Sequence, residues 1–295
     1  MPDKTIGNPV SWSAQRLAGM GRGLGSAVEG IGSHEMTRPQ VNSIGTGDIR
    51  AALRQGARDF AALRSDVIIG VALYPVIGFV LAVWAFNAGQ VHLLFPLVAG
   101  FPLVGPVAAV GLYEMSRRRE AGEPADWGAA LAALTGRVLG PVLALSALLA
   151  VIFVVWLYAA HAIWAATLGP ESYVGLLDFL RATLTTRDGW TMILAGTGVG
   201  FVFAGVVLCL ALVSFPMLID RPVGVPVALA TSLAVVRRNP RAAATWGLVV
   251  AVSLLLGMIP LFAGLILVLP ILGHATWHLY RRAVTWPDRG MASER

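Results

Sequence analysis

Charged residues are scarce in this sequence, and their scarcity limits the class of protein that it can encode. Only 13% of the 295 residues are charged and 57% are hydrophobic, whereas ordinary soluble domains contain about 25% charged residues. The mean hydropathy of the chain is +0.73. These values exclude an ordinary water-soluble fold and predict a protein whose main partner is the lipid bilayer.

Cysteine is almost absent as well, because Cys209 is the only one in the chain. A single cysteine excludes an internal disulfide framework. The sequence also lacks a Ser/His/Asp or Cys/His set with a recognisable motif around it, and such sets identify common hydrolases. We therefore expect a protein that is not an enzyme and that needs no cofactor.

Long apolar runs make up much of the sequence. A helix crosses a bilayer with about 20 apolar residues, and six runs approach that length: 67–86, 94–114, 138–164, 190–219, 242–260 and 262–281. Three shorter segments, 48–64, 126–136 and 224–236, stand before alternate runs and are typical of helices at a membrane surface. The expected fold class is therefore all-α: a polytopic membrane protein with six transmembrane helices in three hairpins, each preceded by a short cytoplasmic interfacial helix.

Basic residues are distributed unevenly around the six runs. If the chain crosses the membrane at all six runs, only Arg181 and Arg187 of the 22 Lys and Arg residues fall on the side opposite the rest. Positively charged loops stay in the cytoplasm, so both termini are expected there. Residues 1–47 are then a disordered cytoplasmic tail, 48–284 the six-helix transmembrane domain, and 285–295 a second cytoplasmic tail. The clustered arginines indicate anionic lipid headgroups as partners and no nucleic acid.

An internal repeat links the second and sixth runs. With an offset of 164 residues and no gap, FPLVAGFPLVGPVAAVGLYEMSRR (95–118) aligns with IPLFAGLILVLPILGHATWHLYRR (259–282), and two prolines occur at matched depth. The pattern predicts an interfacial helix plus hairpin used three times, at 48–118, 124–221 and 224–283. Repeats of this kind often mark transporters, although duplication of a stable hairpin is the favoured explanation.

Two histidines near the end of the last run are candidate ligands. His274 and His278 lie one helical turn apart, a spacing that suits two ligands of a metal ion or haem. Glu114 aligns with His278 in the repeat. Both Glu114 and Asp220 lie at the ends of predicted spans, at a depth similar to that of the two histidines, so a polar cluster of all four is possible at the inner surface. The alternatives are a polar substrate site, hydrogen bonds to neighbouring helices, or ion pairs with nearby arginines, namely Arg117, Arg221 and Arg281.

A second pair of histidines is expected near the outer boundary. His92 and His161 can form a pair for haem or copper, or they can serve as ordinary interfacial residues. No Asp, Glu, Lys or Arg occurs in the middle of any predicted span, whereas proton-coupled transporters usually carry ionisable groups there. That absence argues against a proton-coupled transporter.

Two stretches of the sequence resemble a known family. GPVAAVGLYEMSRRREAGEP (105–124) combines a Tyr-Glu helix end with an arginine cluster, and PILGHATWHLYRRAV (270–284) contains a Gly-His-Ala-Thr-Trp-His turn. Both are similar to an uncharacterised family of bacterial integral membrane proteins, the domain of unknown function 2189, over about residues 45–284. The resemblance implies a multi-pass protein of the bacterial inner membrane and implies no activity.

Three functions are compatible with these features. The leading interpretation is a non-enzymatic accessory or scaffold subunit of a membrane complex, with a membrane-protein partner or a second copy of the chain. It rests on apolar spans without central charges and on the basic cytoplasmic face. The first alternative is a small-solute transporter or channel with its path near Pro106 and Pro270. The second is a haem- or metal-binding membrane protein that uses His274 and His278.

Overall fold

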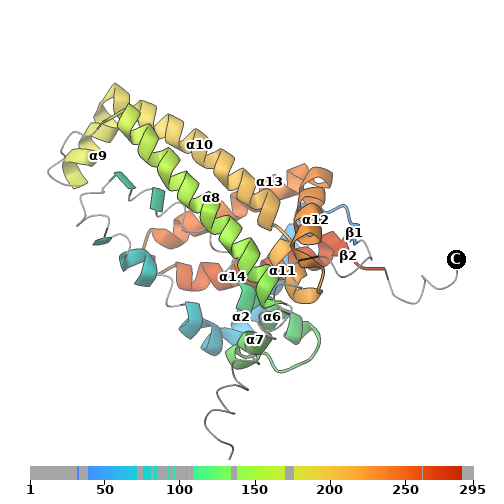
Figure 1. The fold of residues 1–295 in the computed structure, drawn as a ribbon. Coiled ribbons are helices and arrows are strands. Elements are labelled where there is room, and N and C mark those ends of the chain that lie inside the picture. The colour runs from blue at the N-terminus through green and yellow to red at the C-terminus, as the bar shows by residue number, and fades with distance from the viewer. Residues whose placement is uncertain are drawn as a thin grey trace, which may run out of the picture.

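The computed structural model describes residues 39–71, 76–80, 83–84, 92–93, 96–97, 109–133, 138–169, 176–260 and 262–287, with Gly32 and Pro106 as single residues. Most of this part of the chain is helical (Figure 1). In chain order the elements are β1 (Gln40–Val41), α2 (Thr46–Val71), α6 (Val110–Glu120), α7 (Trp127–Ala133), α8 (Leu139–Ala166), α9 (Leu176–Thr185), α10 (Arg187–Ala211), α11 (Ser214–Asp220), α12 (Gly224–Arg238), α13 (Pro240–Met258), α14 (Leu265–Ala283) and β2 (Val284–Thr285). The expected all-α class is confirmed, apart from the two short strands.

Three stretches of helix in the described part of the chain are long and apolar enough to cross a membrane. They are Leu139–Ala166, Arg187–Asp220 and Pro240–Met258. The second of them runs through α10 and α11. These stretches coincide with the predicted spans 138–164, 190–219 and 242–260, because uninterrupted apolar residues specify both a helix and its burial in lipid.

The other predicted spans have a different outcome. Parts of the run 67–86 and most of the run 94–114 lie outside the described residues. The run 262–281 forms the helix α14, but α14 is not among the stretches apolar enough to span a membrane. Its second half carries His274, His278 and a pair of arginines, which lower its hydropathy. Six spans in three hairpins are therefore not confirmed.

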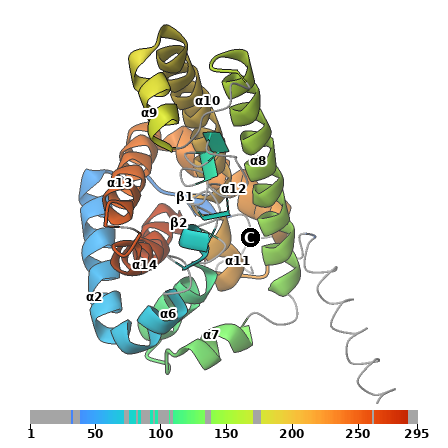
Figure 2. The same cartoon turned by 90° about the vertical axis from the view of Figure 1, so that its left-hand side faces the viewer.

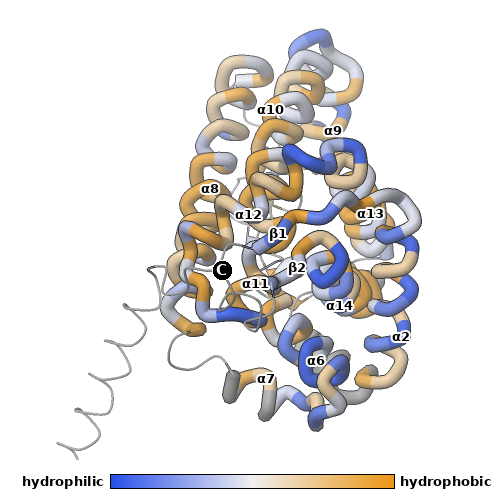
Figure 3. Tube along the Cα trace, turned by 90° about the vertical axis from the view of Figure 1, so that its right-hand side faces the viewer, coloured by the Kyte–Doolittle hydropathy of each residue, from blue (hydrophilic) through white to orange (hydrophobic). Residues whose placement is uncertain are grey.

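The apolar helices α8 and α10 lie side by side (Figure 1). The short helix α9 lies at one end of this pair, whereas α6, α7 and α11 lie toward the other end (Figure 2). Hydropathy follows a similar division. The tubes of α8 and α10 are mostly hydrophobic, and hydrophilic residues are frequent on α2 and α6 (Figure 3).

The helix α2 packs along α14, and this is the most extensive contact between two elements. Gly56 permits the close approach, because a Cβ atom at this position would lie 2.6 Å from the backbone nitrogen of Ala275. Ile49 and Ala52 of α2 are also buried. The predicted interfacial helix 48–64 is therefore the first part of a longer helix, and that helix covers another helix of the same chain.

The other two predicted surface helices are present. The helix α7 falls within the predicted segment 126–136, and α12 begins at Gly224 as predicted. One face of α12 is buried, including Ala228, Ser232 and Val235, and it contacts α10, α11 and α13. The position of these helices at a membrane surface stays a prediction.

A two-stranded ribbon joins segments from opposite ends of the chain. β1 and β2 are antiparallel, with Val41 opposite Val284. Asn42 extends the contact, because its Nδ2 donates a hydrogen bond to the carbonyl oxygen of Arg282 at 2.8 Å. Residues 40–42 are therefore ordered, contrary to the predicted disordered tail 1–47. Strands of two residues leave no periodic pattern from which they can be predicted.

Candidate functional site

Polar side chains from three helices meet in a buried group, the Asp59 cluster, which consists of Asp59 of α2, Ser116 and Arg119 of α6, and His274 and His278 of α14. Asp59 Oδ2 accepts hydrogen bonds from Ser116 Oγ at 2.7 Å and from His278 Nε2 at 2.8 Å. Arg119 Nε lies 3.2 Å from Asp59 Oδ1. One buried carboxylate thereby joins α2, α6 and α14.

His274 is fully buried and contacts the cluster through Nδ1, which lies 2.8 Å from Ser116 Oγ. The hydroxyl proton of Ser116 is donated to Asp59, so Ser116 Oγ must accept the second hydrogen bond and His274 Nδ1 must carry the proton. In the neutral imidazole, Nε2 then holds a lone pair. This atom is buried and has no hydrogen-bond partner within the described part of the chain.

The partners of Asp59 keep it ionised. Burial by itself raises the pKa of a carboxyl group. Hydrogen bonds from His278 and Ser116, together with the charges of the neighbouring imidazoles when protonated, outweigh burial and lower the pKa of Asp59 below its ordinary value of 3.8. Loss of those partners would leave an uncompensated buried charge, which is strongly destabilising.

Asp59 is on the buried face of α2 because it continues a helical spacing of three, four and three residues from Ile49, Ala52 and Gly56. Neither Asp59 nor Ser116 is among the site residues predicted from the sequence. A carboxylate on the apolar stripe of an amphipathic helix requires a partner. This is the signal by which Asp59 can be recognised, whereas no comparable signal distinguishes Ser116.

Glu114 and Asp220, the other two residues of the predicted polar cluster, are engaged elsewhere. Glu114 is buried and its Oε2 accepts a hydrogen bond from Arg117 Nε at 2.7 Å. Asp220 Oδ2 accepts a hydrogen bond from the hydroxyl of Tyr280 at 2.7 Å, and Arg281 Nη1 is 3.7 Å away from the same oxygen. The ion-pair alternative therefore describes Glu114 and Asp220 better than the shared cluster does.

The predicted metal ligands His274 and His278 do come together in the Asp59 cluster. Each uses one ring nitrogen in it, which leaves His274 Nε2 and His278 Nδ1 for a ligand. Within the residues that the structure describes, no three His, Cys, Asp or Glu side chains are grouped so as to hold a metal ion. Metal or haem binding by this pair stays a prediction.

The predicted outer pair of histidines is also brought together. His92 Nε2 and His161 Nδ1 are 3.0 Å apart, and the His92 ring stacks on Trp164 with 3.7 Å between centroids. Burial, with a smaller contribution from His161, lowers the pKa of His92 to about 4. His92 is therefore neutral at pH 7. Copper or haem at this pair stays a prediction.

Part of the chain matches the model of one known family. Residues 94–220 match the domain of unknown function 2189, described as a predicted integral membrane protein. With the three apolar stretches, this match identifies an integral membrane protein. No curated protein and no solved structure matches the chain. The part that matches domain of unknown function 2189 includes the quoted stretch 105–124 and the helices α6 to α11, whereas 270–284 lies beyond it.

Proposed function

We propose that the protein is a non-enzymatic accessory or scaffold subunit of a complex in the bacterial inner membrane. The observation that carries this proposal is the outward surface of α8, where only 22% of the most apolar stretch is buried. Val151 and Tyr158 of α8 are 59% and 73% exposed, and Phe201 of α10 is 73% exposed. Side chains of this kind need lipid or another membrane helix as a cover.

The way in which the polar groups are used also supports a structural role. Asp59, Glu114 and Asp220 are each paired with side chains of the same chain. Such pairs hold helices in a defined arrangement. A ligand site, in contrast, presents convergent polar groups to a cavity. His274 Nε2 is the exception, because its lone pair is not used.

The proposed topology has six spans and places both termini in the cytoplasm. It follows from the excess of arginine in alternate loops and puts the segments near residues 120 and 239 on the cytoplasmic side. Reporter fusions test it directly. A reporter active only in the cytoplasm should work at both positions, and activity of a periplasmic reporter at either one would reverse the orientation.

The scaffold role is tested by purification from native membranes in a mild detergent, followed by cross-linking and mass spectrometry. A membrane partner or a second copy of the chain should accompany the protein in fixed proportion. Val151→Trp enlarges an outward side chain of α8, which lipid tolerates and a packed partner helix does not. It should abolish the association without changing the thermal unfolding of the purified protein.

Leu255→Trp is the matched control, because Leu255 is outward and 63% exposed but belongs to α13. A protein that is strictly solitary in native membranes would contradict the scaffold role. If both tryptophan variants keep the partner, the association does not use α8.

Metal or haem binding through His274 and His278 is a second proposal. The buried, unpaired His274 Nε2 favours it, because an imidazole lone pair is an ordinary ligand of zinc, copper and iron. Metal analysis and an absorbance spectrum of the purified protein test it, with His274→Leu as the comparison. A metal or haem content that is absent, or unchanged in His274→Leu, would reject this site.

A further inference from the structure

The arginines of α2, α6 and α14 fall into two groups. Those of α6 and α14 are paired with carboxylates: Arg117 and Arg118 with Glu114, Arg119 with Asp59, Arg281 with Glu120, and Arg282 with Asp48. Arg50, Arg54 and Arg58 of α2 are exposed and form no ion pair with any residue that the structure describes. Their charges are therefore left for a partner outside this part of the molecule.

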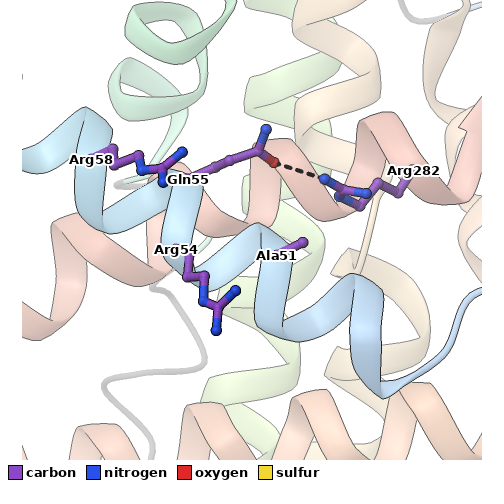
Figure 4. Close-up of a pocket in the computed structure, with 5 residues that line it drawn as sticks. All are labelled: Ala51, Arg54, Gln55, Arg58 and Arg282. Carbon is purple, nitrogen blue, oxygen red and sulfur yellow. Dashed lines mark hydrogen bonds between the residues drawn. The ribbon is translucent and has the colours of Figure 1, made fainter.

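Arg54 and Arg58 border an open hollow of about 220 Å³, and Ala51, Gln55 and Arg282 complete its lining. Figure 4 shows that Arg282 of α14 points toward Gln55, and Nη2 of Arg282 donates a hydrogen bond to Gln55 Oε1 at 3.2 Å. Arg58 extends toward Gln55 from the opposite side, whereas Arg54 points away from Gln55 and Arg282 (Figure 4). Two helices thus contribute three guanidinium groups.

Charge and shape point to the same kind of ligand. Arg54 and Arg58 are four residues apart on one helix, where like charges repel each other. Arg282 is paired with Asp48, whose Oδ1 lies 3.5 Å from Nη1 of Arg282. One carboxylate does not balance three guanidinium groups. Guanidinium groups present planar pairs of N–H donors that match the oxygens of a phosphate group.

We propose that the hollow between Arg54, Arg58 and Arg282 is a binding site for a phosphate group. The group can come from the headgroup of an anionic phospholipid or from a soluble phosphate compound. The first source rests on the proposed function, since a headgroup reaches the hollow only if α2 lies at the membrane surface. The second source does not depend on membrane placement.

The experiment uses the full chain purified in detergent and has two arms. In the first arm, thermal unfolding is followed as inorganic phosphate is added, against sodium chloride at the same ionic strength. In the second, the protein is placed in nanodiscs of phosphatidylcholine with increasing phosphatidylglycerol, and bound lipid is counted by native mass spectrometry. The test variant is Arg54→Gln with Arg58→Gln, which keeps Arg282 and its contacts.

Arg237→Gln with Arg238→Gln is the matched control. It removes two exposed arginines from the end of α12, and neither of them lines the hollow. The Arg54/Arg58 variant should weaken binding about tenfold or more, because each charge-assisted hydrogen bond that is lost costs roughly a factor of ten. The control should change binding less than about twofold. Both variants should unfold at the temperature of the wild type in the absence of phosphate.

The two arms distinguish the sources of the phosphate group. A variant-sensitive effect of inorganic phosphate assigns the site to soluble phosphates, and an effect of phosphatidylglycerol alone assigns it to lipid. Equal binding by the Arg54/Arg58 variant and its control in both arms would overturn the site. Reporter fusions that reverse the orientation while phosphate binding persists in detergent would contradict the proposed topology and leave the site standing.

Discussion

The α8–α10 pair and the α2–α6–α14 group of helices are held together in different ways. In α8 and α10, the hydroxyl groups of Ser146 and Thr191 donate hydrogen bonds within their own helix, to the carbonyl oxygens of Val142 at 2.6 Å and of Arg187 at 3.0 Å. These bonds do not link one helix to the other. The helices α2, α6 and α14 are instead joined by hydrogen bonds that cross from one helix to another, with Asp59 as the shared acceptor.

This difference has a physical reason. Lipid chains are as apolar as leucine, so helices in a bilayer associate by close packing and not by removing apolar surface from water. Large outward side chains on α8 and α10 are therefore acceptable. The α2–α6–α14 group buries charge, and a buried charge is acceptable only when it is paired. The four predictions below test this contrast, from the largest expected effect to the smallest.

Removal of the Asp59 carboxylate should have the largest effect on stability. Asp59→Ala leaves Ser116, His278 and Arg119 without their acceptor, and breaking a buried ion pair costs about 3–5 kcal/mol. The free energy of unfolding in detergent, measured by circular dichroism, should fall by this amount. Asp178→Ala removes an exposed carboxylate of α9 and should cost less than about 1 kcal/mol. Equal effects of the two changes would show that the Asp59 cluster is not a structural centre.

A methyl group at Gly56 should separate α2 from α14. Gly56→Ala puts a Cβ atom 2.6 Å from the backbone nitrogen of Ala275, and forced overpacking of this kind costs about 1–3 kcal/mol. The same change at Gly196 of α10 meets nothing within 4 Å and should stabilise its helix by up to about 1 kcal/mol. Opposite shifts in thermal unfolding are expected. If Gly56→Ala stabilises the protein instead, α2 and α14 are not in the close contact described above.

Acid should act on His92 at a higher pH than on the Asp59 carboxylate. The pKa of His92 is about 4 in the folded protein and 6.5 in a model compound. Between these values the unfolded chain binds more protons, so the contribution of His92 to stability falls as the pH falls from 6.5 to 4. The pKa of Asp59 is below 3.8, so its contribution persists above 3.8 and is lost only at lower pH.

The two pH windows can be separated by fluorescence. His92 stacks on Trp164, and the difference between the spectra of the wild type and Trp164→Phe should therefore change around pH 4, where His92 becomes protonated in the folded protein. Loss of the contribution of the Asp59 carboxylate should require a pH below 3.8. A single transition that includes both signals would show that the outer pair and the Asp59 cluster are coupled.

Truncation of an outward side chain on α8 should have the smallest effect. Leu143 is 57% exposed, and substitutions at exposed sites usually change stability by less than about 0.5 kcal/mol. The thermal unfolding of Leu143→Ala in detergent should therefore match that of the wild type. A larger loss would show that Leu143 packs against another part of the protein.

Features that depend on neighbouring residues could be predicted from the sequence. The apolar stretches of α8, α10 to α11 and α13 agree with runs of hydropathy, and the start of α12 agrees with its pattern. The pairing of Glu114 with Arg117 could also be anticipated, because residues three apart on a helix are neighbours. His274 and His278 were correctly placed on one face for the same reason.

Features that depend on residues far apart in the chain could not be predicted from the sequence. Asp59 is 57 residues from Ser116 and 219 residues from His278 in the chain. Asn239, whose Nδ2 donates to the carbonyl oxygen of Asn42 at 2.9 Å, gives no signal in its own segment. Neither contact follows from a local pattern, because each depends on how whole helices pack.

The amino-acid sequence by itself determined that this is a membrane protein and where its most apolar helices lie. Hydropathy and helical periodicity are properties of consecutive residues, so they can be evaluated without the fold. The tertiary structure alone decided which charges are neutralised by residues of another helix. Asp59, Arg119 and His278 come within bonding distance only after Gly56 lets α2 approach α14, and the same packing leaves Arg54 and Arg58 without a partner in the described part of the chain.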